Sequence, residues 1–510
     1  MRTCFWQGTI TALVILVSGC ASAPLDAPRE ASFAVAETSD TRQARNVAGW
    51  LDGQTDANGF YPLNQGFDAF GVRLAVADGA QVSIDLQYFL MKADKAGYVL
   101  AAKLLDAADR GVRVRMLLDD IFTTVDDKQL AVLDAHPNLE VRIFNPIARK
   151  GIYGLNYLGN FSLTNRRMHN KALITDNQIA VVGGRNLGVE YYQLEETGEF
   201  MDFDMLTVGP IVREVSGQFD AYWNHQLAVP LAALHTPESE EKIGERRAAL
   251  DKLMADAGHS IYGEAINTKV LQQLGDHSAS PYIAEARLIV DDPQKLMEEI
   301  STEQKIVANE VGQALLNAKS EVMISTPYFI PRERGMEIIE EIRSRDVRVV
   351  LFTNSLGTNN HTAVHSAYSS YRKDLLKAGV ELWEARADAT QVTNEDGELV
   401  PGKLTLHTKG MLFDREQVFV GSLNLDPRSL DINTEMGLLI DSPELGSSLG
   451  DLFDRMLELR AYRVKLDDDG NLSWHATIDG KRVVETTDPQ TSAWKRYKAW
   501  FLKIAPENQL

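Results

Sequence analysis

The sequence predicts an α/β protein made of two copies of one α-β-α sandwich module, related by a pseudo-two-fold axis with a site at their interface. The first observation is an internal repeat, in which a motif beginning at His169 recurs at His407, 238 positions later (407 minus 169). The second is the alternation of strand-like and helix-like segments within each copy. A single repeat of this length indicates one duplication and not a solenoid. The matched residues are His169, Lys171, Asp176, Gly183 and Asn186 and, in the same order, His407, Lys409, Asp414, Gly421 and Asn424.

Within the first copy, strands alternate with helices along the chain. Residues 82–89 and 112–118 are short apolar runs rich in strand-forming residues, and residues 100–109 between them have helical spacing and end before a glycine. Residues 138–144 form a third predicted strand, closed by an Asn-Pro pair. Residues 322–329 repeat the first strand in the second copy. The alternation predicts a largely parallel sheet covered by helices on both faces.

Each copy of the motif brings a histidine and a lysine to one spot. Residues i and i+2 of a strand face the same way, so His169 and Lys171 present an imidazole and an ammonium together. Asp176 falls in a polar corner from which the next strand returns. Gly183 and Gly184 at the end of that strand allow the backbone to approach a ligand closely.

Two histidines that face each other across a doubly cationic pocket suit attack on a phosphodiester without a metal. One imidazole would attack phosphorus and form a covalent phosphohistidine, while the opposite imidazolium would protonate the leaving alcohol and then activate the incoming water or alcohol. The lysines and nearby polar groups would hold the phosphate oxygens as charge develops. The candidates for phosphate binding are Lys171, Lys409, Asn186, Asn424, Gly184 and Ser422.

A catalytic histidine also needs an acceptor for its other ring nitrogen. Asp202 and Glu435 lie at comparable distances past the two motifs and are the candidates, with Asp204 as the alternative to Asp202. The residues alone leave open which histidine is the nucleophile. The full set of catalytic candidates is His169, His407, Lys171, Lys409, Asp176, Asp414, Asp202 and Glu435.

The paired motif resembles that of the phospholipase D superfamily, and further segments, among them residues 111–120, resemble its bacterial cardiolipin synthase C branch. The resemblance implies two phospholipase D-like modules and a phosphohistidine mechanism that uses no metal or other cofactor. It implies that His169 is the nucleophile and His407 the acid/base. It also implies that Asp176 and Asp414 mainly support the structure through hydrogen bonds.

The composition argues against a nucleic-acid substrate. The 52 Lys and Arg residues and 72 Asp and Glu residues give a formal net charge of −20, and such a surface repels a phosphate backbone unless a local basic groove offsets it. A nuclease-type phosphodiesterase stays as an alternative because the chemistry is shared, and an inactive lipoprotein scaffold is a further alternative. Both cysteines lie within the first 20 residues, which excludes a disulfide framework from the body of the protein.

The N-terminus resembles a bacterial lipoprotein signal. A basic residue, a short apolar stretch and Ser18-Gly19-Cys20 predict a signal peptide over residues 1–19, with Cys20 as the lipidated residue. Ala21, which is not an aspartate, favours the outer membrane, so we expect a membrane-anchored lipoprotein on the periplasmic side. The divisions predicted after the signal are a tether (20–45), a first module (46–235), a helical connection (236–310), a second module (311–475) and a C-terminal tail with an amphipathic helix (476–510).

Two further features have both a functional and a structural interpretation. His365, with Tyr368 and Tyr371 at helical spacing, lines the substrate entrance in one interpretation and is a satisfied helix histidine in the other. The basic amphipathic helix predicted over residues 494–504 is either an anchor at a membrane interface or a terminal helix whose aromatic rings dock into the core.

Together these observations predict a phosphatidyltransferase or phospholipase D that acts on glycerophospholipids through a phosphohistidine. Cardiolipin synthase-type transfer to phosphatidylglycerol or another alcohol is the expected reaction, and hydrolysis to phosphatidic acid is the alternative in which water is the acceptor. The expected partners are the phospholipid membrane and its lipids, with no nucleic acid, and the sequence leaves the oligomeric state open.

Overall fold

The computed structural model describes residues 22–149, 156, 161–194, 197–257, 263–297, 300–393, 399–504 and 507. The predicted signal peptide and its neighbours Cys20 and Ala21 lie outside these residues. Within the described residues, no helix is both long and apolar enough to cross a membrane.

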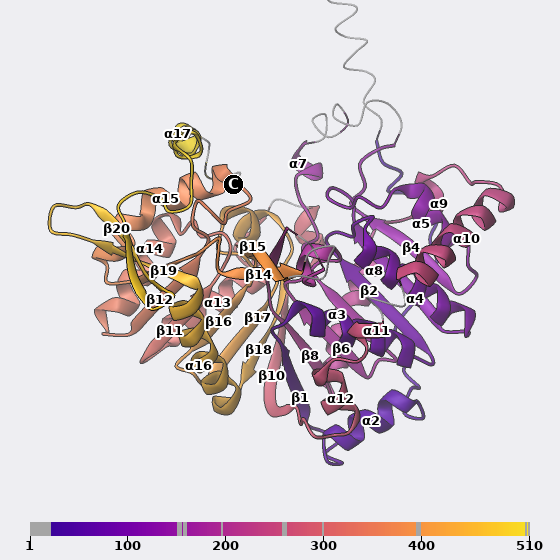
Figure 1. The fold of residues 1–510 in the computed structure, drawn as a ribbon. Helices are drawn as coiled ribbons and strands as arrows, with labels where there is room; N and C mark the ends of the chain where they lie inside the picture. Colours follow the sequence, from indigo (N-terminus) through magenta and orange to yellow (C-terminus); the bar gives the residue numbers. More distant parts are fainter. Residues whose placement is uncertain are drawn as a thin grey trace, which may run out of the picture.

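Two copies of one module stand side by side and share a continuous 18-stranded sheet (Figure 1). The first copy contributes, from its outer edge inward, β9 (Ala228–Pro230), β4 (Leu139–Phe144), β3 (Arg113–Asp119), β2 (Ser83–Tyr88), β5 (Ala172–Thr175), β6 (Ile179–Gly183), β8 (Asp204–Val208) and β1 (Asn58–Leu63). The second copy continues with β10 (Tyr282–Val290), β18 (Met436–Asp441), β17 (Gln417–Gly421), β16 (Gly410–Phe413), β11 (Glu321–Ser325), β12 (Arg348–Thr353), β13 (Glu381–Ala385), β19 (Ala461–Leu466), β20 (Leu472–Ile478) and β21 (Lys481–Glu485).

The strand order confirms the duplicated α/β fold and corrects one detail of it. β2, β3 and β4 are parallel, as are β11, β12 and β13 in the second copy. All other neighbours in the sheet are antiparallel, so the sheet is mixed and not largely parallel. The hairpins β5–β6 and β16–β17, which the polar corner at the end of each motif predicts, reverse the chain direction and add antiparallel strands to the sheet.

The two copies meet at β1 and β10, which pair antiparallel with Gly59 opposite Ile283. Both strands occupy the same place in their copies, because β1 pairs with β8 and β10 with β18. β10 lies within residues 236–310, which the sequence analysis predicted to be a helical connection. That prediction is wrong at β10: the range is not helical throughout, because β10 interrupts it and belongs to the sheet of the second copy.

Helices cover both faces of the sheet in each copy. α3 (Gly66–Gly79), α4 (Lys95–Asp109) and α5 (Asp127–Asp134) cover one face of the first copy and α8 (Ile211–Trp223) the other. The equivalent helices of the second copy are α13 (Ile306–Asn317), α14 (Arg332–Ser344) and α15 (Thr362–Lys377) on one face and α16 (Pro443–Arg460) on the other. The remaining helical elements are α2 (Arg42–Trp50), α7 (Phe161–Thr164), α9 (Leu231–Leu234), α10 (Glu240–Ala257), α11 (Gly263–Ala265), α12 (Lys269–Gly275), α17 (Ala493–Phe501), the 3₁₀ turns Val189–Tyr191, Pro293–Leu296 and Leu502–Ile504, and the π turn Arg428–Ile432.

One apolar core belongs to both copies. It lies under α8 and α16 and includes Met205 and Val212 of the first copy together with Met436 and Leu457 of the second. Two further cores lie on the opposite face of each sheet, one per copy. A shared close-packed core resists relative movement of the copies, so residues from both can form one precise site.

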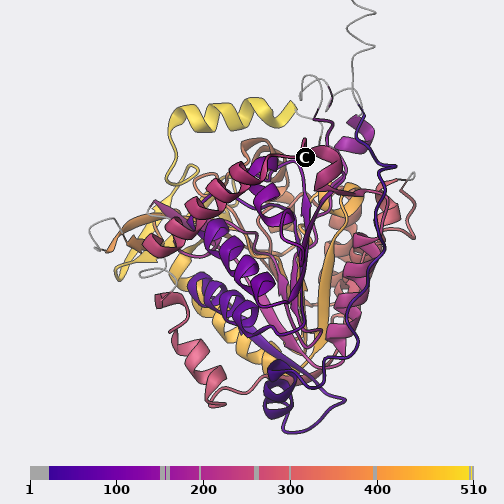
Figure 2. The same ribbon diagram turned by 90° about the vertical axis from the view of Figure 1, so that its right-hand side faces the viewer.

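The chain ends differ from the predicted tether and tail. Residues 22–41 run along the first module toward α2 (Figure 2), where the Ser32 amide donates to Asn224 Oδ1 at 3.0 Å and the Ala34 amide to Asp220 Oδ2 at 2.8 Å. The described part of the predicted tether is therefore bound to the body. At the other end, β20 and β21 extend the second sheet past residue 475, so the tail proper is limited to α17 and the turn that follows it.

Candidate active site

The motif histidines lie at the boundary between the two copies, where short parallel backbone pairings join one copy to the other. β7 (Gly198–Met201) of the first copy pairs with β15 (Leu399–Leu406) of the second, which also forms a hairpin with β14 (Thr390–Thr393). Met201 lies opposite Leu406, and an isolated parallel bridge joins Met168 to Thr434. In both pairings, the residue that directly follows the paired position is a histidine on one segment and a carboxylic acid on the other. Each histidine therefore meets an acid of the opposite copy.

Glu435 of the second copy holds His169 of the first. The His169 Nδ1 atom lies 2.9 Å from Glu435 Oε2, and the His169 amide donates to the Thr434 carbonyl at 2.9 Å. The Ser422 hydroxyl also donates to Glu435. Phe89 meets the imidazole edge-on with ring centroids 4.8 Å apart. Burial raises the pKa of Glu435 to about 7.

Asp202 of the first copy holds His407 of the second in the equivalent way. The His407 Nδ1 atom lies 2.5 Å from Asp202 Oδ2, and the His407 amide donates to the Met201 carbonyl at 2.8 Å. The ring of Phe200 stacks on the imidazole with centroids 5.5 Å apart. Although burial opposes it, attraction to His407 and Lys409 holds the pKa of Asp202 below its ordinary value.

Both motif lysines are buried beside the histidines. Lys171 Nζ donates to the His169 carbonyl at 2.5 Å, and Lys409 Nζ lies 2.9 Å from His407 Nδ1. Burial lowers the pKa of Lys171 to about 7 and that of Lys409 to about 8.

The charges of both lysines act on both histidines. Burial lowers the pKa of His407 to about 3 and that of His169 well below its ordinary value, and Lys171 and Lys409 each add to both shifts. The four buried side chains are therefore close enough for their charges to interact across the boundary between the copies. Lys171 and Lys409 place positive charge beside imidazoles that stay neutral, and Asp202 and Glu435 offset part of that charge from behind the rings.

Asn186 and Asn424 are buried residues that follow the two hairpins. The Asn186 amide group donates to the Tyr191 hydroxyl at 3.0 Å. Among the described residues, the Oδ1 atoms of Asn186 and Asn424 are buried and have no hydrogen-bond partner. Unsatisfied buried amide groups are costly, and rotation of the amide presents either oxygen or NH₂ to a ligand. Their placement fits the predicted contact with phosphate.

The glycine pair after β6 approaches carboxylates and not a ligand. A Cβ atom on Gly184 would lie 2.2 Å from Asp202 Oδ1, and one on Gly183 would lie 2.3 Å from Asp204 Oδ1. Asp204 itself pairs with Arg73 at 2.9 Å and Arg185 at 3.0 Å. Asp202 and not Asp204 therefore contacts a histidine. Gly184 leaves space for Asp202 and the Ser422 hydroxyl donates to Glu435, while contact of either residue with phosphate stays a prediction.

Replacing Gly184 with alanine is expected to lower kcat about a hundredfold, because the added methyl group displaces Asp202 and with it the His407 ring. The control is Gly217→Ala, an exposed position in α8 where a Cβ atom has nothing within 4 Å. Steady-state kinetics on both variants, with thermal unfolding to verify folding, checks this. Equal rates for the two variants would show that the close approach of Gly184 to Asp202 is not needed for activity.

The motif aspartates lie at the far ends of their hairpins from the histidines. Asp176 accepts backbone N–H groups of residues 81–83, and Asp414 accepts those of residues 319–321. Both residues have positive φ angles, 49° and 58°, at tight corners. The prediction that these two aspartates are catalytic is therefore wrong. Each one ties its hairpin to the neighbouring strand, which fits the structural role that the resemblance implied.

His365 and Tyr368 lie in a buried ionic cluster and do not line an entrance. His365 Nε2 lies 3.2 Å from an Arg372 nitrogen, and the Tyr368 hydroxyl donates to Glu384 at 2.7 Å. Arg372 also pairs with Glu384 at 2.7 Å and with Asp488 at 2.8 Å. Both side chains are buried, so the substrate-entrance prediction is wrong, and His365 is a buried helix histidine that is partnered through Nε2.

Removal of Glu384 is expected to destabilise the protein by about 3–5 kcal/mol, because it leaves the buried Arg372 short of its main partner. Glu384 also accepts from the Trp474 indole at 2.9 Å. The matched control is Glu381→Ala on the same strand, whose partly exposed pair with Arg348 should contribute at most about 1 kcal/mol. Denaturant unfolding of Glu384→Ala and Glu381→Ala measures both; similar losses would contradict the prediction.

The two carboxylates at the end of β3 form ion pairs with arginines. Asp119 accepts the Met168 amide at 3.0 Å and pairs with Arg167 at 3.1 Å, while Asp120 pairs with Arg149 at 2.7 Å. In the part of the chain that the structure describes, no group of three or more His, Cys, Asp or Glu residues is placed to hold a metal ion. Asp119 thus fixes the backbone immediately before His169.

Three aromatic residues of the site were not identified from the sequence. Phe89 packs on His169, and Tyr191 and Phe200 pack on His407. Phe89 is the last residue of the first predicted strand, and this position is the sequence signal that could have indicated its place in the site. Tyr191 and Phe200 act on the histidine of the opposite copy, so no local pattern indicates them.

A duplicated α/β fold that buries two His-Lys pairs at the boundary between its copies, each imidazole held by a carboxylate of the other copy, defines a protein of the phospholipase D class. A family profile described as "Cardiolipin synthase, PLD-like domain" matches residues 74–223 and 311–457. The chain belongs to this family.

Individual relatives agree with the family. The chain is 34% identical to cardiolipin synthase C of Escherichia coli (strain K12) over 463 residues, which cover 88% of this chain and 95% of that protein. It is 26% identical to the major cardiolipin synthase ClsA of Bacillus subtilis (strain 168), with 76% and 66% covered. Among solved structures, phosphatidylserine synthase of Haemophilus influenzae Rd KW20 shares the fold with a TM-score of 0.54 at 12% identity, covering 81% of this chain and 91% of that one.

Proposed function

We propose that the protein is a phosphatidyltransferase that moves a phosphatidyl group from a glycerophospholipid to phosphatidylglycerol or another alcohol through a phosphohistidine. The observation that carries the proposal is the pair of buried imidazoles, each oriented through Nδ1 by a carboxylate of the opposite copy. Orientation through Nδ1 leaves Nε2 of His169 available for attack, while Nε2 of His407 lies 3.2 Å from Lys409 Nζ. The cardiolipin synthases among its relatives support a phospholipid substrate.

In the proposed first step, His169 is the nucleophile and His407 the acid. The Nε2 lone pair of His169 forms a bond to phosphorus as the bond from phosphorus to the headgroup oxygen breaks. The departing oxygen takes a proton from His407 and leaves as the free alcohol. Lys171 and Lys409 stabilise the charge on the phosphate oxygens during this displacement.

The second step reverses the first with a new alcohol. The incoming hydroxyl gives its proton to His407 as its oxygen attacks phosphorus, and the bond to His169 Nε2 breaks with its electrons returned to the ring. Two displacements leave the configuration at phosphorus unchanged.

The protonation states of the two histidines suit the nucleophile but not the acid. The lowered pKa values leave both imidazoles neutral at pH 7, as a nucleophile requires. The acid must gain its proton when an anionic phosphodiester binds between the lysines and offsets their charge. Substrate binding is therefore expected to take up a proton, which a pH-indicator dye or calorimetry in two buffers would detect.

Membrane attachment is also part of the proposal. We propose that Cys20 is acylated after removal of residues 1–19 and that the protein works on the periplasmic side, with Ala21 favouring the outer membrane. Both donor and acceptor would then be lipids of the same leaflet.

The test is incubation of the purified protein with defined phospholipids, with and without phosphatidylglycerol, in the presence of EDTA. Mass spectrometry of the lipid products is expected to show cardiolipin and the released headgroup alcohol, because the proposed chemistry needs no metal ion. Phosphatidic acid alone would establish hydrolysis. Cleavage of an oligonucleotide with no lipid product would overturn the proposal in favour of a nuclease.

A further inference from the structure

We propose that the exposed aromatic face of α17 is a docking surface for a phospholipid bilayer. Three ring side chains of this helix are largely exposed: Trp494 at 71%, Tyr497 at 53% and Trp500 at 65%. Large aromatic side chains seldom stay in water without a partner, so a helix that exposes three of them in sequence requires an explanation.

The rings form one continuous stripe. They are spaced three residues apart, which places them on one side of the helix. Ring centroids lie 5.6 Å apart between Trp494 and Tyr497 and 6.0 Å apart between Tyr497 and Trp500. Phe501 and Ile504 are exposed beside this stripe and widen it.

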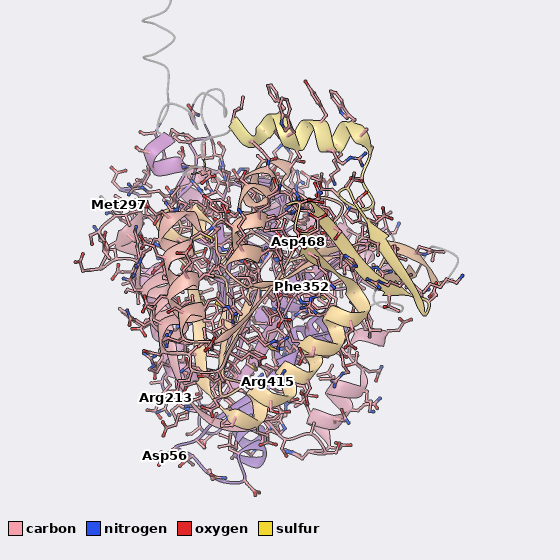
Figure 3. All side chains as sticks on the ribbon, turned by 90° about the vertical axis from the view of Figure 1, so that its left-hand side faces the viewer. Asp56, Arg213, Met297, Phe352, Arg415 and Asp468 are labelled. Atoms are coloured by element: carbon pink, nitrogen blue, oxygen red, sulfur yellow. The ribbon has the colours of Figure 1, made fainter. Side chains whose placement is uncertain are left out.

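The helix presents the opposite polarity from an ordinary surface helix, which turns its apolar face inward. Its inward side carries Ala499, which is buried, and Lys495, whose ammonium contacts the Gly357 carbonyl at 3.4 Å. The Arg496 guanidinium turns back to the Thr491 carbonyl at 2.7 Å. Figure 3 shows the ring side chains of α17 directed away from the body. The alternative in which these aromatics dock into the core is therefore wrong.

The surface lies on one side of the molecule together with two other features. α17 and α7 share that side in all three views, and residues 22–41 begin there before they run down to α2 (Figures 1 and 2). Arg29 fixes the start of this segment by donating to the Gln226 carbonyl at 2.6 Å and the Ala228 carbonyl at 3.0 Å. A lipid on Cys20, two residues before Ser22, would thus enter a bilayer from the same side.

The chemistry of the surface selects a bilayer as its occupant. Trp and Tyr favour the headgroup level of a membrane, where an apolar ring and a polar N–H or O–H group are both satisfied. Lys498 and Lys503 are exposed at the flank of the stripe, although the chain as a whole carries a net charge of −20. Cations beside interfacial rings match anionic lipid headgroups. The inference goes beyond the proposed function because this surface lies outside the catalytic pocket.

Vesicle binding tests the surface directly. The full chain is used with Cys20→Ser, which removes the proposed site of acylation, and with vesicles of phosphatidylcholine and phosphatidylglycerol. Trp494→Ala/Tyr497→Ala/Trp500→Ala is expected to weaken binding in flotation assays about tenfold or more. The control is Ile283→Ala, an exposed apolar residue of β10. Unchanged binding by the triple variant at an unchanged thermal midpoint would overturn the proposal.

Depth measurement provides a second readout that does not depend on overall affinity. Brominated lipids quench tryptophans that enter the bilayer, so the Cys20→Ser chain is expected to lose fluorescence on such vesicles, and Trp494→Phe/Trp500→Phe should abolish most of that loss. Equal quenching of the two proteins would overturn the proposal. A lipid-free dimer in sedimentation velocity that the triple variant dissociates would instead assign the surface to a second copy of the chain.

Discussion

Replacing either His169 or His407 with alanine is expected to lower phosphatidyl transfer at least about ten-thousand-fold, because nucleophile and acid act as one unit. The double variant should be little slower than either single one, since each loss already removes the covalent route. His136→Ala, outside the site and paired with Asp109, is the control and should leave the rate unchanged. Lipid product analysis under initial-rate conditions measures all four proteins.

A substrate with a good leaving group separates the two roles. Phosphatidyl-p-nitrophenol does not need protonation of its leaving oxygen, so His407→Ala should still release one equivalent of nitrophenol and then stall as the phosphohistidine. His169→Ala should show no such burst. A burst in His169→Ala but not in His407→Ala would reverse the proposed roles, and a burst in neither would contradict the covalent mechanism.

Replacing Asp202 with asparagine is expected to lower kcat about a thousand- to ten-thousand-fold with little change in KM, because the carboxylate contacts the His407 ring and not the lipid. Asparagine preserves the size of the side chain but removes the charge that stabilises the imidazolium. Because the Asp202 pKa is lowered in the folded protein, the carboxylate stays ionised over the whole neutral range. The wild-type rate should therefore show no titration of Asp202 between pH 5 and pH 8, the range in which histidine titrates.

Glu435→Gln provides the matched variant at the other histidine. It should lower kcat by a similar factor, since Glu435 holds His169 as Asp202 holds His407. The ¹⁵N shifts of the imidazoles would report the tautomer directly: Asp202→Asn should alter the signal of His407 and leave that of His169 unchanged. A change confined to His169 would contradict the cross-copy pairing.

The cross-copy pairs explain why neither module can be a catalyst alone. Each copy supplies one histidine, one lysine and the acid for the histidine of its partner, and the two are held together by β1, β10 and a shared core. The pocket is therefore as rigid as the interface between the copies, which suits a mechanism based on precise positioning.

Much of the fold could be predicted from local patterns. The three parallel strands at residues 83–88, 113–119 and 139–144 and the helix that ends at Asp109 lie within a few residues of their predicted places, because apolar periodicity and a following glycine are local signals. β10 was missed because it follows the long charged helical stretch that contains α10, although its exposure alternates as in a half-buried strand, with Glu285 and Arg287 on the exposed side.

The sequence by itself determined that the chain is duplicated, that each copy carries a His-Lys pair, and that the paired chemistry is displacement at a phosphodiester. These conclusions follow from residue types at fixed spacing. Only the tertiary structure decided that Glu435 serves His169 and Asp202 serves His407, that Asp204 binds arginines, and that the rings of α17 face outward. The physical reason is that parallel register between segments more than 200 residues apart, and the direction in which a helix turns its face, depend on packing between elements and not on the pattern within any one of them.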